Sequence, residues 1–297
     1  MSMYRLLLTA ILVLSLPAFS QDCTTSVVVN AFDFRLGVDI QTLKADDFKA
    51  RMDGTPLEIV NLRQGYNSRL LVLLETDGAQ DNEKVSEVVD TVTRMARQAP
   101  EGKPVAFGVY AARAEFTKGF FADQEKRTAE INAIVEQANS LGKRVALFDA
   151  LHQALSMFGE HQPGDTILLV GVPYDDKSSH SVADIEKEFL ATGTRLMVMF
   201  REQISHTYRD FMWNTHRPER RLFSDVPGET GGADSAFDPH FFGFTWRGYL
   251  MELRLPESVR KPQKWQMKLQ QNIPHSKLYY PQVLSPCRVA STEKGNE

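Results

Sequence analysis

The 297-residue sequence lacks several features that would narrow its function at once. Its 34 basic and 38 acidic residues give a formal net charge of -4, so there is no cationic excess that would gather nucleic acid. It contains no H-E-x-x-H zinc motif, no G-x-S-x-G nucleophile elbow and no P-loop. A hydrolase site assembled from distant residues stays an open alternative, but the sequence favours a protein without catalytic activity.

Cysteine is also scarce, because only Cys23 and Cys287 occur, near opposite ends of the chain. Neither has a second cysteine or a histidine at the spacing of zinc ligands. In an oxidising compartment such a pair is more often a disulfide than two free thiols. We therefore predict a disulfide bond that joins the two terminal segments.

A long apolar stretch occurs only at the N-terminus. Residues 1–20 carry one early cation, Arg5, then an apolar run from Leu6 to Leu16, and small residues at Ala18 and Ser20. This pattern is typical of a secretory signal peptide cleaved after Ser20, and the run is short for a bilayer span. We predict a secreted or periplasmic protein with no membrane span after cleavage.

The middle of the chain contains short apolar segments separated by helix-like sequence. The apolar segments are Leu70–Leu74, Thr166–Val172 and Arg195–Phe200. Such runs fit strands that are buried on both faces of a parallel sheet. Strand-like and helix-like sequence alternates, which predicts an α/β fold with a doubly wound, mostly parallel sheet and helices on both faces.

Both ends of the mature chain have strand-like sequence instead. Val27–Phe32 and Gly248–Leu255 are examples, and Asp53-Gly54 between two alternating runs indicates a β-hairpin. We predict a small β-sandwich module built from both termini, with the α/β domain inserted in it. The expected parts are a signal peptide (1–20), the β module (21–66 and 243–288), the α/β domain (67–242) and a flexible tail (289–297).

The order of several short motifs resembles a known family. The motifs are Leu43…Asp47-Phe48…Asp53-Gly54…Ile59, Leu70–Gly78, Ala146–Leu151, Thr166–Ser179, Thr230-Gly231-Gly232 and Tyr249–Pro256. In this order they resemble exported bacterial proteins related to the von Willebrand factor A domain. The resemblance implies an A-type α/β domain that binds another extracytoplasmic protein at the carboxyl edge of its sheet.

An intact A domain holds a divalent cation with oxygen ligands from a D-x-S-x-S loop, a threonine and an aspartate. The resemblance places these positions at Glu75, Asp77 and Ala79, at Val145, and near Gly171 and Val172. Most of the oxygen donors are therefore missing, and we expect no cofactor. The alternative is a cation-dependent adhesion domain that binds Mg²⁺ or Mn²⁺ through Glu75 and Asp77.

The residues predicted to form the binding edge are Glu75, Thr76, Asp77, Gly78, Asp149 and Asp175. We interpret Glu75 and Asp77 as solvated carboxylates near a helix N-terminus, where the helix dipole favours negative charge. Asp149 is expected to stabilise the first turn of its own helix. Asp175 and Asp176 are expected to be turn residues, and the alternative is that they supply replacement oxygens on the third loop.

Overall fold

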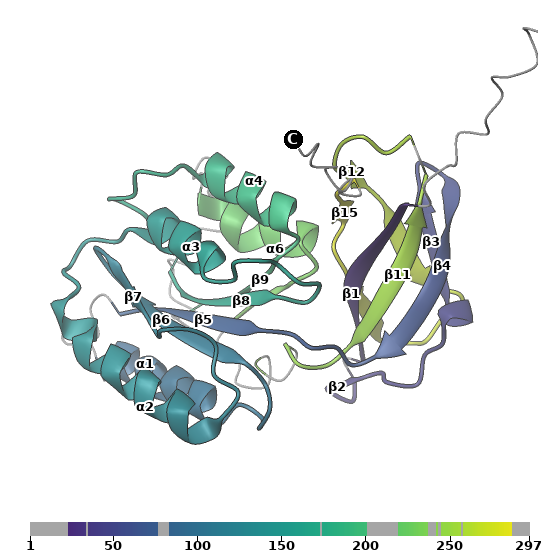
Figure 1. Cartoon of the computed structure of the whole chain (residues 1–297). Coiled ribbons are helices and arrows are strands. Elements are labelled where there is room, and N and C mark those ends of the chain that lie inside the picture. The colour runs from purple at the N-terminus through teal and green to yellow at the C-terminus, as the bar shows by residue number, and fades with distance from the viewer. Residues whose placement is uncertain are drawn as a thin grey trace, which may run out of the picture.

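The structure is a computed structural model, and it describes residues 23–33, 35–76, 83–172, 174–200, 219–236, 242, 245–256 and 258–286. Its strands form two main sheets, in an α/β part and a β module that stand side by side (Figure 1). The predicted signal peptide and the predicted tail lie outside the described residues. No helix in the described ranges is long and apolar enough to cross a membrane.

The α/β part has a six-stranded sheet in the order β10-β9-β8-β5-β6-β7. Its strands are β5 (Leu70–Glu75), β6 (Val105–Tyr110), β7 (Ala114–Phe116), β8 (Thr166–Gly171), β9 (Arg195–Phe200) and β10 (Asp234–Ala236). All neighbours are parallel except β7, which pairs antiparallel with β6 at one edge. The predicted α/β class is confirmed. After β5, the chain adds β6 and β7 along one edge of β5, and it then adds β8, β9 and β10 along the other edge. The direction of winding therefore reverses between β5 and β8.

Helices cover both faces of this sheet (Figure 1). They are α1 (Glu83–Arg97), α2 (Gln124–Gln137), η2 (Ala138–Ser140), α3 (Leu147–Ser156), α4 (Val182–Thr192), η3 (Arg221–Asp225) and α6 (Val226–Glu229). Leu70, Val72 and Leu74 of β5 pack in the cluster under α1 and α2. Leu71 and Leu73 pack in the cluster under α3, α4 and α6. Successive strand residues point to opposite faces, so a strand covered on both sides needs an unbroken apolar run.

The β module is built from both ends of the described chain, because β1 pairs antiparallel with β11. Its elements are β1 (Cys23–Asp33), β2 (Val38–Asp39), η1 (Ala45–Asp47), β3 (Phe48–Met52), β4 (Thr55–Gln64), β11 (Tyr249–Leu255), β12 (Gln263–Lys264), β13 (Gln266–Leu269), β14 (Ser276–Tyr279) and β15 (Val283–Leu284). The predicted hairpin is confirmed, since Asp53 and Gly54 join β3 to β4 with φ angles of 48° and 79°.

The module matches the predicted sandwich only in part. Seven strands belong to one sheet, with β12 and β15 as a separate ribbon. The cause is the length of β1, which pairs with β11 over Cys23–Val29 and with β14 over Asn30–Asp33. No cysteine is free in the described part of the chain. Cys287 lies outside that part, so its bond to Cys23 stays a prediction.

Candidate functional site

The candidate site is the carboxyl edge of the α/β sheet, where β5 and β8 end next to each other. In open α/β sheets, ligands bind where the winding of the strands reverses. Glu75 is the last residue of β5, and its side chain is buried, with the residue only 1% exposed. Its Oε2 accepts a 2.6 Å hydrogen bond from the backbone N–H of Val172. The interpretation of Glu75 as a solvated loop carboxylate is therefore wrong, because β5 continues through Glu75, which pairs with Tyr110 of β6.

Gly171 shows how closely this corner is packed. A Cβ atom at Gly171 would lie 2.6 Å from the Tyr110 hydroxyl and 2.8 Å from Glu75 Oε2. Thr76 is 7% exposed, and its hydroxyl donates to the Tyr110 carbonyl over 3.3 Å. The Glu75 carboxylate thus fills the space beside the end of β8. Asp77 and Gly78 lie outside the described residues.

Asp175 and Asp176 hold the start of α3 in place. Asp175 Oδ1 accepts a 2.7 Å hydrogen bond from the N–H of Leu147. Asp176 Oδ1 accepts a 2.8 Å bond from the N–H of Val145. These two aspartates do more than form a turn, because Ala146 at the N-cap has no side chain that could satisfy the first N–H groups of α3.

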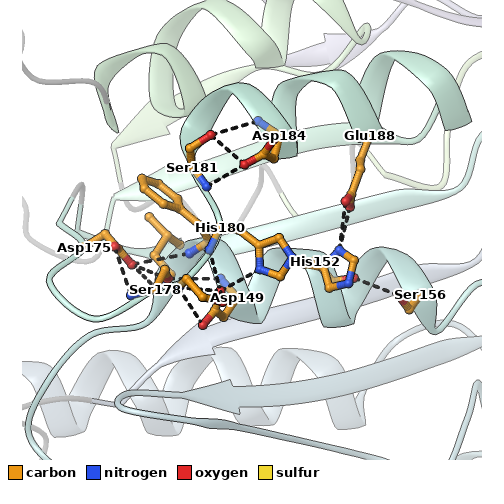
Figure 2. A network of polar contacts seen from close by, with 12 residues as sticks. Asp149, His152, Ser156, Asp175, Ser178, His180, Ser181, Asp184 and Glu188 are labelled. Carbon is orange, nitrogen blue, oxygen red and sulfur yellow. Dashed lines mark hydrogen bonds and ion pairs between the residues drawn. The ribbon is translucent and has the colours of Figure 1, made fainter.

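Asp149 lies in the first turn of α3, and its carboxylate also contacts a neighbouring loop. Its carboxylate accepts hydrogen bonds from the backbone N–H groups of Ser179 and His180, each at 3.0 Å. His180 Nδ1 lies 2.7 Å from Asp149 Oδ1 (Figure 2). Burial of the carboxyl raises its pKa, but the hydrogen bonds from His180 and Ser179 outweigh burial and lower the pKa to about 2. Asp149 therefore fastens the β8–α4 loop to α3 in its charged form.

Two histidines extend this network along α3 and α4. The rings of His152 and His180 stack, with centroids 4.2 Å apart and planes 22° apart. His152 Nδ1 lies 2.9 Å from Glu188 Oε1, so each ring has its own carboxylate (Figure 2). We did not predict this pair. Asp149 and His152 are three residues apart on one helix face, so the sequence spacing could have predicted that these two side chains lie close together. No local pattern predicts that His180 lies beside them.

The described residues at the positions of the metal ligands do not supply the oxygen atoms that an intact A domain uses. Val145 is aliphatic and 2% exposed, and neither Gly171 nor Val172 carries a side-chain oxygen. The Glu75 carboxylate is engaged by a backbone N–H. Over the described residues there is no group of three or more His, Cys, Asp or Glu side chains that could hold a metal ion.

No protein-family model and no curated protein matches the sequence. Among solved structures, the chain is similar to von Willebrand factor type A from Catenulispora acidiphila, with 10% identity and a TM-score of 0.47, over 86% of this chain and 71% of that chain. It is also similar to BatB, a conserved hypothetical protein from Bacteroides thetaiotaomicron, with 10% identity and a TM-score of 0.44, over 60% of this chain and 95% of that one.

A third similar structure is an aerotolerance-related membrane protein from Bacteroides fragilis NCTC 9343, with 11% identity and a TM-score of 0.44. The similar region covers 59% of this chain and 94% of that chain. The fold of this chain is established by its own strand order, and the site by its own contacts.

Proposed function

We propose that this protein is a non-catalytic, extracytoplasmic interaction module that binds another extracytoplasmic protein at the carboxyl edge of its α/β sheet without a metal ion. The observation that carries the proposal is the state of Glu75, the residue nearest the reversal of the winding. Its carboxylate is buried and bonded to the Val172 N–H. Because this carboxylate is bonded within the protein, the edge is already formed before a partner binds. The partner is then recognised by the surrounding surface.

The loops at this edge are held rigidly, which favours binding without rearrangement. Asp149, Asp175 and Asp176 connect the β8–α4 loop to the N-terminus of α3. Tyr174, on the same loop, is 44% exposed. Exposed tyrosines on rigid supports are common anchors in protein interfaces, because they bury much area and lose little conformational entropy.

The histidine pair does not support a hydrolase. Within the described residues, His152 and His180 contact carboxylates and each other, and no hydroxyl or thiol bonds either ring. A nucleophile would need to lie within hydrogen-bond reach of its base. A cavity of about 330 Å³ is lined by residues at the amino ends of the strands, such as Gly164 and Arg195, and neither His152 nor His180 lines it.

Site-specific photocrosslinking tests the proposal. A photoreactive phenylalanine analogue would replace Tyr174, and as a control Glu125, which is exposed at the start of α2 at the opposite end of the sheet. We expect a crosslink to one envelope protein from position 174 alone, with the same yield in the presence of a chelator. No crosslink from position 174, or equal crosslinks from both positions, would contradict the proposal.

The cation-dependent alternative makes a different prediction. If Glu75 and Asp77 bound Mg²⁺ or Mn²⁺, either ion would raise the melting temperature, and Asp77→Ala would abolish that rise, because a ligand that binds only the folded state stabilises it. We expect no rise at millimolar concentrations of either ion. Export is tested separately by N-terminal sequencing of the protein from the culture medium and the periplasm, where the mature chain should begin at Gln21.

A further inference from the structure

The cavity of about 330 Å³ lies between the α/β part and the β module. Its walls come from α4 and α6 on one side and from β1 and β15 on the other, and these elements face each other in Figure 1. Because it lies at the amino ends of β8 and β9, it is at the opposite end of the sheet from the carboxyl edge. Small-molecule sites in proteins measure roughly 300 to 1,000 Å³, so the cavity is large enough for a small ligand.

Much of the cavity wall is apolar. Leu190 of α4, Val28 of β1 and Val283 of β15 contribute hydrocarbon side chains from both parts of the molecule. An apolar group of a ligand is favoured next to such a surface, because the ligand and the wall both lose contact with water. The cavity therefore suits a ligand with a hydrocarbon chain.

Glu229, at the end of α6, supplies the only carboxylate among the described residues that line the cavity. Its side chain is 16% exposed, and its Oε1 lies 3.8 Å from Nη2 of Arg221, too far for a hydrogen bond. Arg221 donates instead to Glu186 Oε1 at 2.5 Å. Oε2 of Glu229 is buried and has no hydrogen-bond partner among the described residues. Buried carboxylates in proteins normally accept hydrogen bonds, so this carboxylate lacks a donor.

The electrostatic surroundings of Glu229 agree with this. Burial raises the pKa of the Glu229 carboxyl, and the nearby carboxylates of Glu186 and Asp225 raise it further. Arg221 and Lys264 lower the pKa, but they do not outweigh burial. A donor bound next to Glu229 would therefore stabilise its charged form.

Arg195 also lines the cavity, but its charged group is already engaged. Its guanidinium donates to three oxygens, those of Asn30, Tyr66 and Gly231. The Glu229 carboxylate accepts no hydrogen bond from a described residue. A ligand that brings a donor to Glu229 therefore gains more than a ligand that brings an acceptor to Arg195.

We propose that the cavity binds a small aliphatic amine, whose ammonium group bonds to the Glu229 carboxylate and whose hydrocarbon chain packs against the apolar wall. An ammonium group carries three donors and a positive charge, and charge-assisted hydrogen bonds are roughly twice as strong as neutral ones. A lysine side chain has the same group, but the limited volume of the cavity favours a free molecule over a segment of a partner protein. The site lies away from the carboxyl edge, so the proposal does not depend on the proposed function.

The test is an NMR titration of the full protein with n-pentylamine at neutral pH, followed through the backbone amide signals. The comparison ligand is n-pentanol, which has the same chain and a neutral hydroxyl group. We expect n-pentylamine to shift the signals of Thr25, Ser26 and Val283, which line the cavity, and to bind at least about tenfold more tightly than n-pentanol. Equal affinities for the two ligands would overturn the proposal, and so would an absence of shifts at the cavity.

Glu229→Gln keeps the size of the side chain and removes its charge. This variant should bind n-pentylamine at least about tenfold more weakly than the wild type, and n-pentanol within about twofold of the wild type. The matched control is Glu125→Gln, at an exposed position on α2, which should bind both ligands within about twofold of the wild type. An unchanged affinity of Glu229→Gln for n-pentylamine would overturn the proposal.

Two further arms locate the site and identify the source of the amine. Ser26→Leu, with its fold checked by circular dichroism, fills the cavity from β1 and should weaken the binding of both ligands. A folded Ser26→Leu variant with unchanged affinities would place the site elsewhere and overturn the proposal. Nα-acetyl-lysine N-methylamide should bind more weakly than n-pentylamine. Tighter binding of this compound, lost in Glu229→Gln, would assign the cavity to a lysine of a partner protein and overturn the free amine.

Discussion

Arg195 and Asn30 join the two parts of the molecule through a 2.7 Å hydrogen bond from the guanidinium Nη2 to the side-chain oxygen. Arg195 begins β9 and Asn30 lies in β1, and the two residues are 2% and 0% exposed. Arg195 also donates from Nη1 to the Tyr66 hydroxyl at 2.9 Å and from Nε to the Gly231 carbonyl at 3.1 Å. A buried network of this kind couples the α/β sheet to the β module, because separating them would leave its polar groups unpaired.

Asn30→Val should therefore weaken the connection between the two parts. It leaves one guanidinium donor without its acceptor in a buried setting, which should lower the free energy of unfolding by about 2 kcal/mol. We also expect urea unfolding to lose coincidence between far-UV circular dichroism, which follows the helices, and tryptophan fluorescence. Asn61→Val in β4, where Asn61 is exposed, is the control. Coincident curves with an unchanged midpoint would show that the contact carries no coupling.

The features that the sequence predicts are those decided by near neighbours in the chain. The unbroken apolar run Leu70–Leu74 predicts a strand covered on both faces, and that is what β5 is. Asp123 accepts from the N–H of Lys126, and Ser181 forms a capping box with Asp184. These interactions span three residues, so the local sequence contains all the information that they need.

The features that the sequence does not predict depend on side chains brought together by the fold. Arg127 is fully buried and donates to main-chain carbonyls that include Arg97 and Ala99, at the end of α1. Asp149 meets Ser179 and His180 only because α3 and the β8–α4 loop lie side by side. A carboxylate or a guanidinium has the same local sequence signal whether it is solvated or buried. For this reason the sequence predicts a solvated Glu75, whereas the fold buries it.

The pH dependence of stability should contain a component from Asp149. The folded state holds its pKa at about 2, below the usual value of 3.8, so the charged form contributes stability above about pH 4 and that contribution is lost as the pH falls towards 2. Because the Asp149 side chain is 27% exposed, solvent screens part of this effect, and we expect the charged form to contribute about 2 kcal/mol to the free energy of unfolding. The difference in unfolding free energy between the wild type and Asp149→Asn should shrink over this range, whereas Asp90→Asn, at an exposed position on α1, should show no such trend. A constant difference would contradict the assignment.

Gly232 should tolerate no side chain. A Cβ atom there would lie 1.8 Å from the carbonyl oxygen of Leu196 in β9, so the backbone would have to shift. We expect Gly232→Ala to lower the free energy of unfolding by about 3 kcal/mol, at the upper end of the cost of overpacking. Gly119 is the matched control, because a Cβ atom at Gly119 meets nothing within 4 Å. Equal midpoints for the two alanine variants in urea would disprove the close approach.

Lys49 and Lys268 lie directly opposite each other in the antiparallel pair β3–β13, and both are exposed. Like charges at such positions repel, so Lys268→Glu should stabilise the protein by about 0.5 kcal/mol. Lys49→Glu should do the same, and the double variant should lose the gain, since it restores a like-charged pair. The gain should also disappear in about 1 M NaCl. Additive gains in the double variant would show that the two side chains do not interact.

The predicted bond between Cys23 and Cys287 would close nearly the whole mature chain into one loop. Cys23 is the first residue of β1, whose pairing with β11 already brings an N-terminal segment against a C-terminal one, so a bond would reinforce that arrangement. Peptide mapping under non-reducing conditions should find the two cysteines in one linked fragment. Reduction, or the double variant Cys23→Ser/Cys287→Ser, should lower the free energy of unfolding by about 2–5 kcal/mol, chiefly by freeing the unfolded chain. Two alkylatable thiols in the native protein would refute the bond, and they would leave strand pairing as the link between the two ends of the β module.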